Sequence, residues 1–547
     1  MARVQRENEV PERDMNEAEI TGADEAAAST TQDPSLAGAT EEELSVFRTD
    51  QQAPESFGKA LAQVVVATII LIGVLGLYLR HVRVQEEVFA LLKSAQNIYL
   101  KDSRADLEKA ATKVEEALSK DDGSEFGNSV GALIYARLFL EQGVADHGPR
   151  AKALCDEAND LDAPLAERYA ACALLDAAES PAKTAEALKT LIKDQGVNAG
   201  PIFGALAFAQ RQQGQPAEAR ANFIRAADIE GRNPNYLVWA SRLYLEADDL
   251  RNAKSTLKRA RDVNPDHLLA RALEVRVLVA DGAELQRAEK ELNFLLGEPE
   301  DSLSPLVTEQ IAVAQAELAR AKGDIEGAKT AIASVSAPGA ELQLVAGLIA
   351  AEASEPEAAA KITSAIDAFP YSARAFHLGA LALAKGGQGD AAKALMTRWA
   401  TELGASEAHS VAFARLLISL EDVEGAQTQL DSALEQNPKS AEALFLKGQL
   451  ADQAGDAEAA YELYGKAVEA RGSYSDALRA LGMANLKQGK AEEALPQLLK
   501  ALKGMKRAGA SAEEMTGLRQ EVAEALRGAG KRGWVNPWLK ETAAFGG

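Results

Sequence analysis

A repeat of 34 residues limits the possible folds of this chain more than any other feature of its sequence. Residues of the same type return in phase at five positions of two consecutive units near the C-terminus. A unit of this length cannot bury an apolar core alone, so neighbouring units must cover one another's apolar faces. The pairs in phase are Gly448 and Gly482, Gly455 and Gly489, Ala460 and Ala494, Lys466 and Lys500, and Ala467 and Ala501.

Each repeated unit is predicted to be a pair of α-helices. Hydrophobic residues make up 47% of the chain but aromatic residues only 5%, so the apolar side chains are mostly small and suit closely packed helices. Two units end in Asn-Pro, at Pro265 and Pro438, where a helix should stop. These features predict an all-α fold. The same spacing links Ala219 with Ala253, Phe223 with Leu257, and Ala226 with Ala260.

The pattern resembles the tetratricopeptide repeat family, a 34-residue helix-turn-helix with small residues at its positions 8, 20 and 27 and a large apolar residue at position 24. The resemblance covers roughly residues 84–505 and implies an α-α superhelix, a solenoid of about eleven or twelve helical hairpins. The matching small residues are Gly448 and Gly482 at position 8, Ala219, Ala253, Ala426, Ala460 and Ala494 at position 20, and Ala226, Ala260, Ala433, Ala467 and Ala501 at position 27. The large residues at position 24 are Phe223, Leu257, Leu430, Tyr464 and Leu498.

The resemblance also implies a concave groove lined by the first helix of each hairpin. In the family, positions 2, 5, 9, 12 and 13 of the unit face this groove. Bases and apolar groups at these positions would suit an extended or helical protein segment with apolar anchors and some acidic groups. The alternative is that they are ordinary solvated positions. The matching residues are Phe208, Arg211, Arg242, Arg415, Phe445, Gln449, Arg479, Met483 and Lys487.

An apolar segment of twenty residues without a charge, residues 60–79, precedes the repeats and is long enough to cross a lipid bilayer. Residues 1–59 carry 14 acidic and 5 basic residues and few large apolar ones, which predicts a disordered tail. The predicted organisation is a disordered acidic tail over residues 1–58, a transmembrane helix over 59–80, degenerate N-terminal hairpins over 81–199, the repeat array over 200–505, and a capping helix with a C-terminal tail over 506–547.

Basic residues flank the predicted span almost equally on its two sides. Arg48 and Lys59 precede it, whereas Arg80, Arg83 and Lys93 follow it, a difference that slightly favours a cytoplasmic array. A single span near the N-terminus, however, usually leaves its tail in the cytoplasm. We therefore expect a single-pass membrane protein, of the bacterial inner membrane, with the array on the exported side.

No motif for catalysis, a metal or a cofactor is found in the sequence. The histidines share no ligand spacing with one another or with the cysteines, and no nucleophile elbow or phosphate loop occurs. Cys155 and Cys172 are interpreted as small core residues, with a disulfide as the alternative if the array is exported. The net charge of -23 argues against nucleic acid. We expect no enzyme, no metal and no cofactor. The histidines are His81, His147, His267, His377 and His409.

These features together predict a membrane-tethered scaffold or assembly factor that binds a partner protein or peptide in the groove of the solenoid. A chaperone-like or secretion-linked envelope factor that captures exported chains is the first alternative. A signalling component whose acidic tail is the effector is the second.

Overall fold

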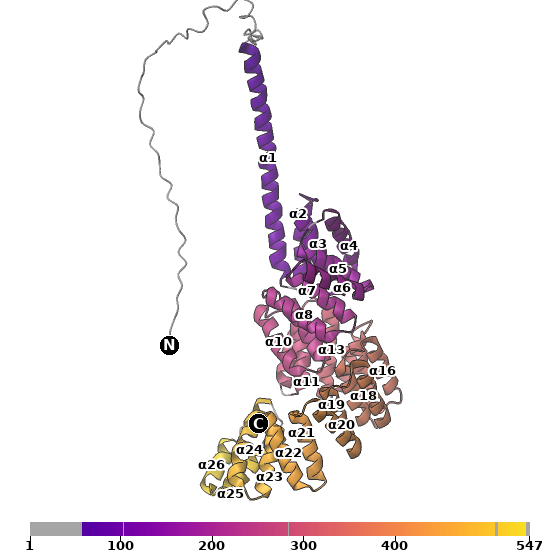
Figure 1. The fold of residues 1–547 in the computed structure, drawn as a ribbon, viewed down its shortest axis with the longest axis vertical. Coiled ribbons are helices and arrows are strands. Elements are labelled where there is room, and N and C mark those ends of the chain that lie inside the picture. Colours follow the sequence, from indigo (N-terminus) through magenta and orange to yellow (C-terminus); the bar gives the residue numbers. More distant parts are fainter. Residues whose placement is uncertain (1–56, 102, 163, 283, 509–511, 543–547) are drawn as a thin grey trace, which may run out of the picture. The chain divides into compact units, whose positions relative to one another are not determined.

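The computed structural model describes residues 57–542, apart from residues 102, 163, 283 and 509–511. The disorder predicted for residues 1–58 therefore falls almost entirely outside the described residues. The chain divides into two compact units, Met1–Arg80 and His81–Gly547. Every described element is a helix, as Figure 1 shows.

The described part of the first unit is the beginning of helix α1 (Phe57–Tyr99). Its large apolar side chains are exposed, and Leu71 for example has a relative exposure of 68%. Among the described residues, α1 is the one helix whose length and composition would allow it to cross a membrane. A buried core helix would instead hide such side chains inside the protein.

The second unit is a series of helical hairpins, in which each first helix packs against the second helix that follows it. The hairpins run from α3 and α4 to α23 and α24, and α2 precedes them. The N-terminal helices are α2 (Arg104–Leu118), α3 (Glu125–Leu140), η3 (Ala145–His147), α4 (Gly148–Asp160), α5 (Ala166–Glu179), α6 (Pro181–Asp194), α7 (Gly200–Gln212) and α8 (Pro216–Ile229).

The middle helices are α9 (Asn235–Glu246), α10 (Leu250–Val263), α11 (Leu268–Asp281), α12 (Leu285–Leu296), η4 (Glu300–Ser302), α13 (Pro305–Ala321), α14 (Ile325–Ala333), α15 (Ala340–Glu352), α16 (Ala358–Ala368), α17 (Ala373–Lys385) and α18 (Gly389–Leu403). The C-terminal helices are α19 (Glu407–Ser419), α20 (Val423–Gln436), α21 (Ala441–Gln453), α22 (Ala457–Ala470), α23 (Ser475–Lys487), α24 (Ala491–Ala508), α25 (Ala512–Gly528), η5 (Arg532–Trp534) and α26 (Val535–Glu541).

The turn inside many hairpins consists of a residue with a left-handed backbone conformation followed by the N-cap of the second helix. After such a turn, Asp422 accepts a hydrogen bond from the backbone N–H of Gly425 at 3.0 Å, and Asp456 does the same for Ala459 at 3.0 Å. The left-handed residue reverses the chain at the end of the first helix, a conformation that glycine adopts without steric cost. The residues with positive φ at a spacing of 34 are Gly214, Asp248 and Gly282, and then Gly387, Glu421, Gly455 and Gly489.

Close contact between the two helices of a hairpin requires the small residues of the repeat. A Cβ atom added to Gly448 would lie 2.7 Å from the ring of Tyr464, and one added to Gly482 would lie 2.8 Å from Leu498. The alanines at positions 20 and 27 are buried almost completely, and the large residue at position 24 fills the space between them. The predicted all-α solenoid of tetratricopeptide-like hairpins is therefore confirmed.

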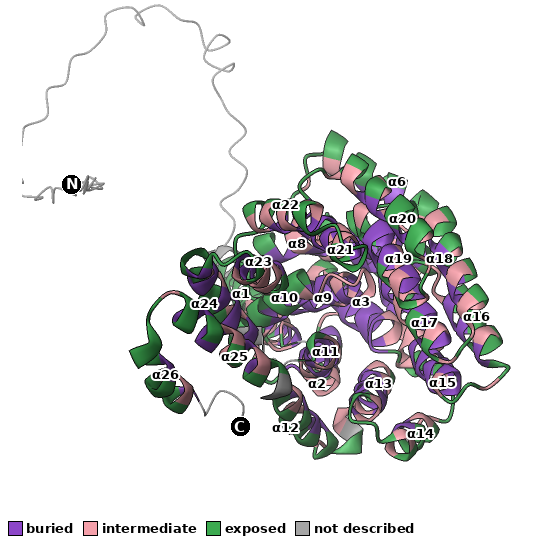
Figure 2. Cartoon of the chain, turned by 90° about the horizontal axis from the view of Figure 1, so that it is seen from below, coloured by how far each residue is buried: buried purple, intermediate pink, exposed green. Residues whose placement is uncertain are grey.

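First and second helices differ in how much of their surface they bury. First helices such as α9 and α11 are buried over most of their length, whereas second helices such as α12 and α16 bury one stripe and expose the rest (Figure 2). An amphipathic second helix with a polar outer face is what keeps a stack of hairpins soluble.

Hairpins that are far apart in the sequence also touch within the second unit. The side-chain amide of Asn264 donates to the backbone oxygen of Lys101 at 2.8 Å. Asp248, in the turn between α9 and α10, pairs with Arg374 of α17 at 3.0 Å and lies 2.7 Å from Nδ1 of His377. Burial would raise the pKa of Asp248, but these two partners hold it below its usual value. The stack is therefore held by contacts beyond those of adjacent hairpins.

The interpretation of the two cysteines as unpaired core residues was wrong. Cys155 of α4 and Cys172 of α5 form a disulfide, with Cα atoms 5.6 Å apart. Cys155 is buried, as expected for a core residue, but α4 and α5 pack against each other across a short connection and bring the two sulfur atoms together.

Candidate protein-binding surface

The structure divides the nine predicted groove residues into three groups. Phe208 and Phe445 lie in the core with relative exposures of 4% and 8%, so neither side chain is available to a partner. Arg211 and Arg242 lie together at the ring of one tryptophan. The remaining five residues lie on first helices of the C-terminal hairpins, where they are exposed or half-buried: Arg415, Gln449, Arg479, Met483 and Lys487.

Trp239 of α9 brings Arg211 and Arg242 together. The guanidinium carbon of Arg211 lies 5.1 Å from the centre of the ring system, and that of Arg242 lies 5.4 Å from it. The ring is buried and stacks on Phe223 with 6.4 Å between centroids. An aromatic face attracts a guanidinium group, so the tryptophan fixes both arginines on the inner helices α7 and α9.

A buried network of charged groups surrounds Glu341 at the start of α15. Its carboxylate accepts from Arg242 at 2.9 Å, from Arg276 at 2.7 Å and from Gln310 at 2.6 Å. Arg276 also pairs with Glu317 at 3.1 Å. Burial alone would raise the pKa of Glu341, but Arg276 and Arg242 hold it far below its usual range. The network joins the inner helices α9, α11, α13 and α15.

Two cavities open beside this network, and Arg211 and Arg242 line both of them. One has a volume of about 690 Å³ and is bordered by apolar residues, among them Leu140, Leu306 and Val335. The other has a volume of about 390 Å³ and extends toward the turn before α17. The inner face of the middle hairpins is therefore partly filled by its own side chains, and the space that remains is divided into pockets.

Basic residues of the C-terminal first helices are already paired with carboxylates of neighbouring helices. Arg415 of α19 pairs with Glu442 of α21, and Nε of Arg479 lies 2.9 Å from Oε2 of Glu521 of α25. Lys487 lies 3.6 Å from Asp452. Gln449 is exposed and Met483 half-buried, and neither side chain forms a hydrogen bond with the described residues. These five positions thus form a polar surface with neutral sites between ion pairs.

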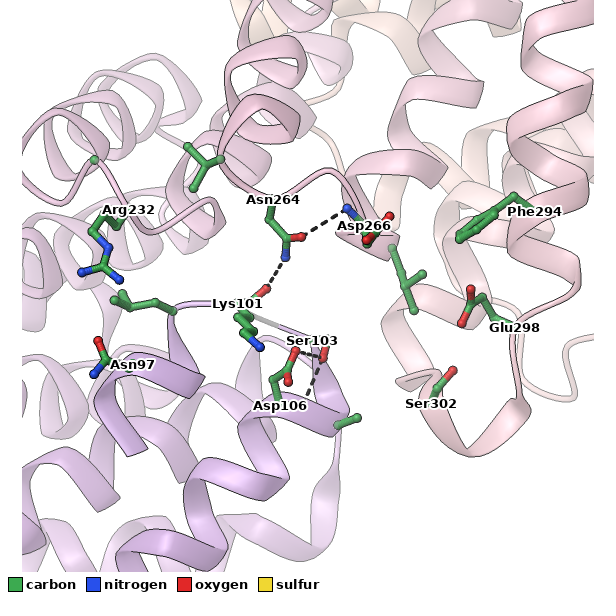
Figure 3. A pocket seen from close by; sticks show the side chains of 15 residues that line it. Asn97, Lys101, Ser103, Asp106, Arg232, Asn264, Asp266, Phe294, Glu298 and Ser302 are labelled. Carbon is green, nitrogen blue, oxygen red and sulfur yellow. Dashed lines mark hydrogen bonds between the residues drawn. The ribbon is translucent and has the colours of Figure 1, made fainter. Parts of the chain in front are cut away.

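Another cavity, of about 1060 Å³, was not predicted from the sequence. Figure 3 shows that its walls come from the end of α1, the start of α2, and the segments around Arg232, Asn264 and Phe294. Acidic and basic side chains are mixed on these walls. Sequence reasoning could not find this cavity, because segments about 200 residues apart must first be brought together by the coiling of the stack.

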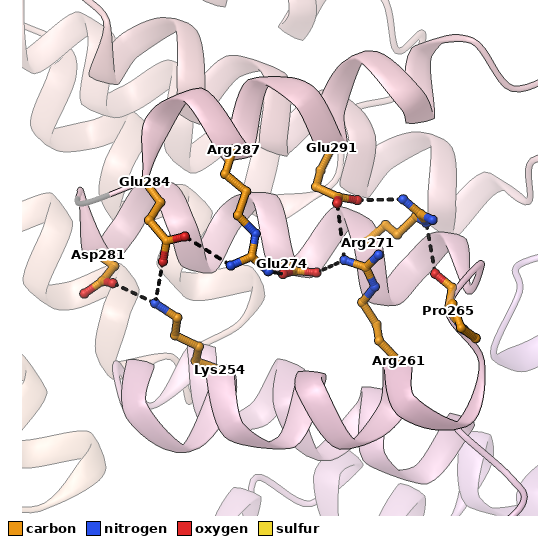
Figure 4. Close-up of polar contacts among 9 residues, drawn as sticks. All are labelled: Lys254, Arg261, Pro265, Arg271, Glu274, Asp281, Glu284, Arg287 and Glu291. Carbon is orange, nitrogen blue, oxygen red and sulfur yellow. Dashed lines mark hydrogen bonds and ion pairs between the residues drawn. The ribbon is translucent and has the colours of Figure 1, made fainter. Parts of the chain in front are cut away.

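The second helix α10 is rich in basic residues, whereas the chain as a whole is acidic. Lys254 of α10 pairs with Asp281 and Glu284, and Arg287 of α12 pairs with Glu274 and Glu284 (Figure 4). Of these groups, Lys254, Glu274 and Arg287 border a cavity of about 770 Å³ between α10, α11 and α12. Because most charges here are paired with their neighbours, the arrangement is that of a surface ion-pair network.

The C-terminal hairpins can now be compared with known proteins. The sequence profile described as tetratricopeptide repeat matches residues 411–475 and 451–513. Residues 411–513 carry tetratricopeptide repeats. This tetratricopeptide segment contains α20 to α24 and most of α19, and with them all five polar surface positions. Repeats of this type indicate protein binding.

None of the curated proteins compared with the chain matches it. Among solved structures, the chain is similar to one in the crystal structure of the APC/C hetero-tetramer Cut9-Hcn1, with 16% sequence identity and a TM-score of 0.38. That match covers 81% of this chain and 95% of the other.

Within the described ranges, no group of three or more His, Cys, Asp or Glu side chains is placed to hold a metal ion. His409 is buried in an aromatic cluster, with its ring centroid 5.1 Å from that of Trp399, and burial lowers its pKa. His409 belongs to α19, and its Nε2 lies 2.9 Å from the backbone oxygen of Met396.

Proposed function

We propose that this chain is a membrane-tethered scaffold that binds a partner protein through the inner face of its hairpin array. The observation that carries the proposal is the match of residues 411–513 to tetratricopeptide repeats, combined with the exposed first-helix positions of that segment. Stacked hairpins present a continuous row of such positions, which suits an extended or helical segment of another protein.

Membrane tethering is supported by the exposed apolar surface of α1. A row of large apolar side chains that the rest of the described chain leaves uncovered is stable in a lipid bilayer and costly in water. Fixing the array at the membrane would raise the local concentration of partners that are themselves at the bilayer.

We place the array on the exported side of the bacterial inner membrane. The disulfide between Cys155 and Cys172 supports this orientation, since disulfides persist in oxidising compartments and are rare in the cytoplasm. Reporter fusions after Arg83 and at Gly547 test it. Activity of an export-dependent reporter at both positions would support the proposal, whereas activity of a cytoplasmic reporter would refute it.

Site-specific photo-cross-linking tests the binding surface. Gln449 on first helix α21 is replaced by a photoreactive amino acid in the full-length chain, and Gln427, an exposed glutamine on second helix α20, provides the matched control. We expect one or two discrete adducts from position 449 and none of the same mass from position 427.

The pattern of adducts also separates the scaffold from its alternative. A broad ladder of many different adducts at position 449 would favour an envelope factor that captures exported chains. Equal adducts at both positions, or none at position 449, would contradict the proposed inner-face binding.

A further inference from the structure

Among the described residues, the side chain of Arg211 has no polar partner, although it lies beside a dense network of ion pairs. Its guanidinium group stacks on Trp239, but it forms no hydrogen bond and no ion pair with the described residues. Burial and the neighbouring Arg242 both lower the pKa of Arg211. The charges of Glu246 and Glu341 act in the opposite direction. A partly buried guanidinium group without a hydrogen-bonded anion is nonetheless costly, because it has lost part of its hydration without gaining a direct partner.

The carboxylates nearest to Arg211 are all engaged elsewhere. Glu341 is bound by Arg276, Arg242 and Gln310, and Glu246 lies 3.2 Å from Nε of Arg242.

Glu309, in the wall of the same cavities, is held by the backbone of Gly339. Burial and the neighbouring Glu341 raise the pKa of Glu309. No carboxylate of the surrounding network is therefore directed at Arg211.

Arg211 lines both inner cavities. The larger, of about 690 Å³, combines this charged group with apolar wall residues such as Leu140, Leu306 and Val335. A planar guanidinium fixed on an aromatic face keeps its donors in a fork that matches a carboxylate. The site thus combines a guanidinium group whose hydrogen-bond donors have no partner among the described residues with space for apolar atoms beside it.

We propose that Arg211 binds a carboxylate of the partner segment, next to an apolar residue that enters the larger cavity. This inference rests on the proposed function, because it takes the ligand to be a protein segment. In this proposal, the middle hairpins select partner segments that carry a carboxylate. The basic groups of the tetratricopeptide segment are already paired within the chain. A carboxylate at Arg211 would supply the direct polar partner that the described residues do not give this side chain.

Peptide pools test the proposal on the full-length chain in detergent. The first pool is a fluorescent, acetylated pentapeptide amide with Glu at its centre and mixtures of Leu, Val, Ala and Ser at the other positions. The second pool has Gln at the centre, and the third has Gln at the centre with a free C-terminal carboxylate. We expect the wild-type chain to bind one carboxylate pool about tenfold more tightly than the Gln amide pool.

The two carboxylate pools distinguish the source of the carboxylate. Preference for the Glu pool would assign a side chain, and preference for the third pool would assign a chain terminus. Either preference supports the proposal. Equal binding of all three pools, or no binding of any, overturns it.

Variants separate binding from folding. Arg211→Gln should abolish the preference while leaving the denaturation midpoint nearly unchanged, since the Arg211 side chain forms no hydrogen bond or ion pair with the described residues. Arg251→Gln removes an exposed arginine of second helix α10 that likewise forms no hydrogen bond or ion pair with the described residues. This variant should leave the preference intact. A preference that survives Arg211→Gln overturns the assignment.

The cross-linking experiment at Gln449 makes the two proposals distinguishable. Discrete adducts at position 449 together with equal binding of the three pools would leave the scaffold standing and reject only the role of Arg211. Absence of adducts would reject the scaffold itself.

Discussion

Replacing Glu341 by Gln should weaken the middle of the array far more than the loss of an exposed charge. The carboxylate is shared by Arg242, Arg276 and Gln310, and all of these side chains are buried or nearly so. Removing one partner of a buried ion pair costs about 3–5 kcal/mol. In the variant, Arg276 still pairs with Glu317 and Arg242 still pairs with Glu246. We therefore expect a loss of stability at the lower end of this range, about 3 kcal/mol.

Native-state hydrogen exchange is the appropriate assay, because long repeat arrays unfold in parts and one global free energy is not well defined. A loss of about 3 kcal/mol corresponds to roughly 100-fold faster exchange of protected amides. The acceleration should appear in α9, α11, α13 and α15, which the network joins, and not in α21 to α24.

Glu326→Gln is the matched control for this prediction. Glu326 pairs with Lys329 at 2.9 Å, but the two side chains have relative exposures of 83% and 54%. Such a pair contributes at most about 1 kcal/mol. If Glu341→Gln and Glu326→Gln changed exchange by similar small factors, the reasoning from the buried network would be refuted.

Acidification should destabilise the middle of the array by protonating the carboxylate of Glu341. The pKa of Glu341 lies below its usual range in the folded chain, whereas in the unfolded chain it is about 4.3. The stabilisation is therefore fully present above about pH 4.3 and is lost progressively as the pH falls below this value. Exchange in α15 should accelerate on acidification in the wild-type chain and much less in Glu341→Gln. An equal acid response of both chains would contradict this account.

Three further predictions concern single features of the fold. Glu421→Gly should stabilise the turn before α20 by about 0.5–1 kcal/mol. A positive φ costs a non-glycine residue about 1–2 kcal/mol, and the greater freedom of glycine in the unfolded chain offsets part of this gain. A lower denaturant midpoint of the variant would contradict this prediction. Cys155→Ser with Cys172→Ser should destabilise the N-terminal hairpins by about 3 kcal/mol, since the disulfide closes a loop of 17 residues. If a reductant left the melting of the wild-type chain unchanged, that estimate would be wrong. Leu71→Arg should disfavour membrane insertion by about 2.5–3.5 kcal/mol and shift the chain into the carbonate-soluble fraction; an unchanged membrane fraction would refute the role of α1.

The hairpins could be predicted from the sequence because their determinants are local. Gly448 and Gly482 allow close approach within one hairpin, and the residue that reverses the chain returns at the same spacing. The turn residues that are not glycine, such as Asp248 and Glu421, were harder to recognise, since propensity alone does not place acidic residues at positive φ. The 34-residue spacing of the repeat was therefore sufficient to predict the fold.

The inner face could not be predicted from the same register. Arg242 and Glu341 are 99 residues apart, and their pairing depends on the small rotation between successive hairpins, which sequence spacing does not encode. The same rotation buries Phe208 and Phe445, which the repeat positions placed in the groove. The unpartnered state of Arg211 likewise emerges only when all its neighbours are known.

The contacts between Asp248 and α17 have a consequence for how the array could change in length. A stack joined only through adjacent units tolerates duplication or loss of a unit, because each interface is replaced by a similar one. Here an added or deleted hairpin between α10 and α17 would displace Arg374 and His377 from Asp248. Growth by whole-unit duplication is thus hindered in the middle of the array. At its C-terminal end, where α19 to α24 contact mainly their sequence neighbours, the chain can gain or lose units more freely.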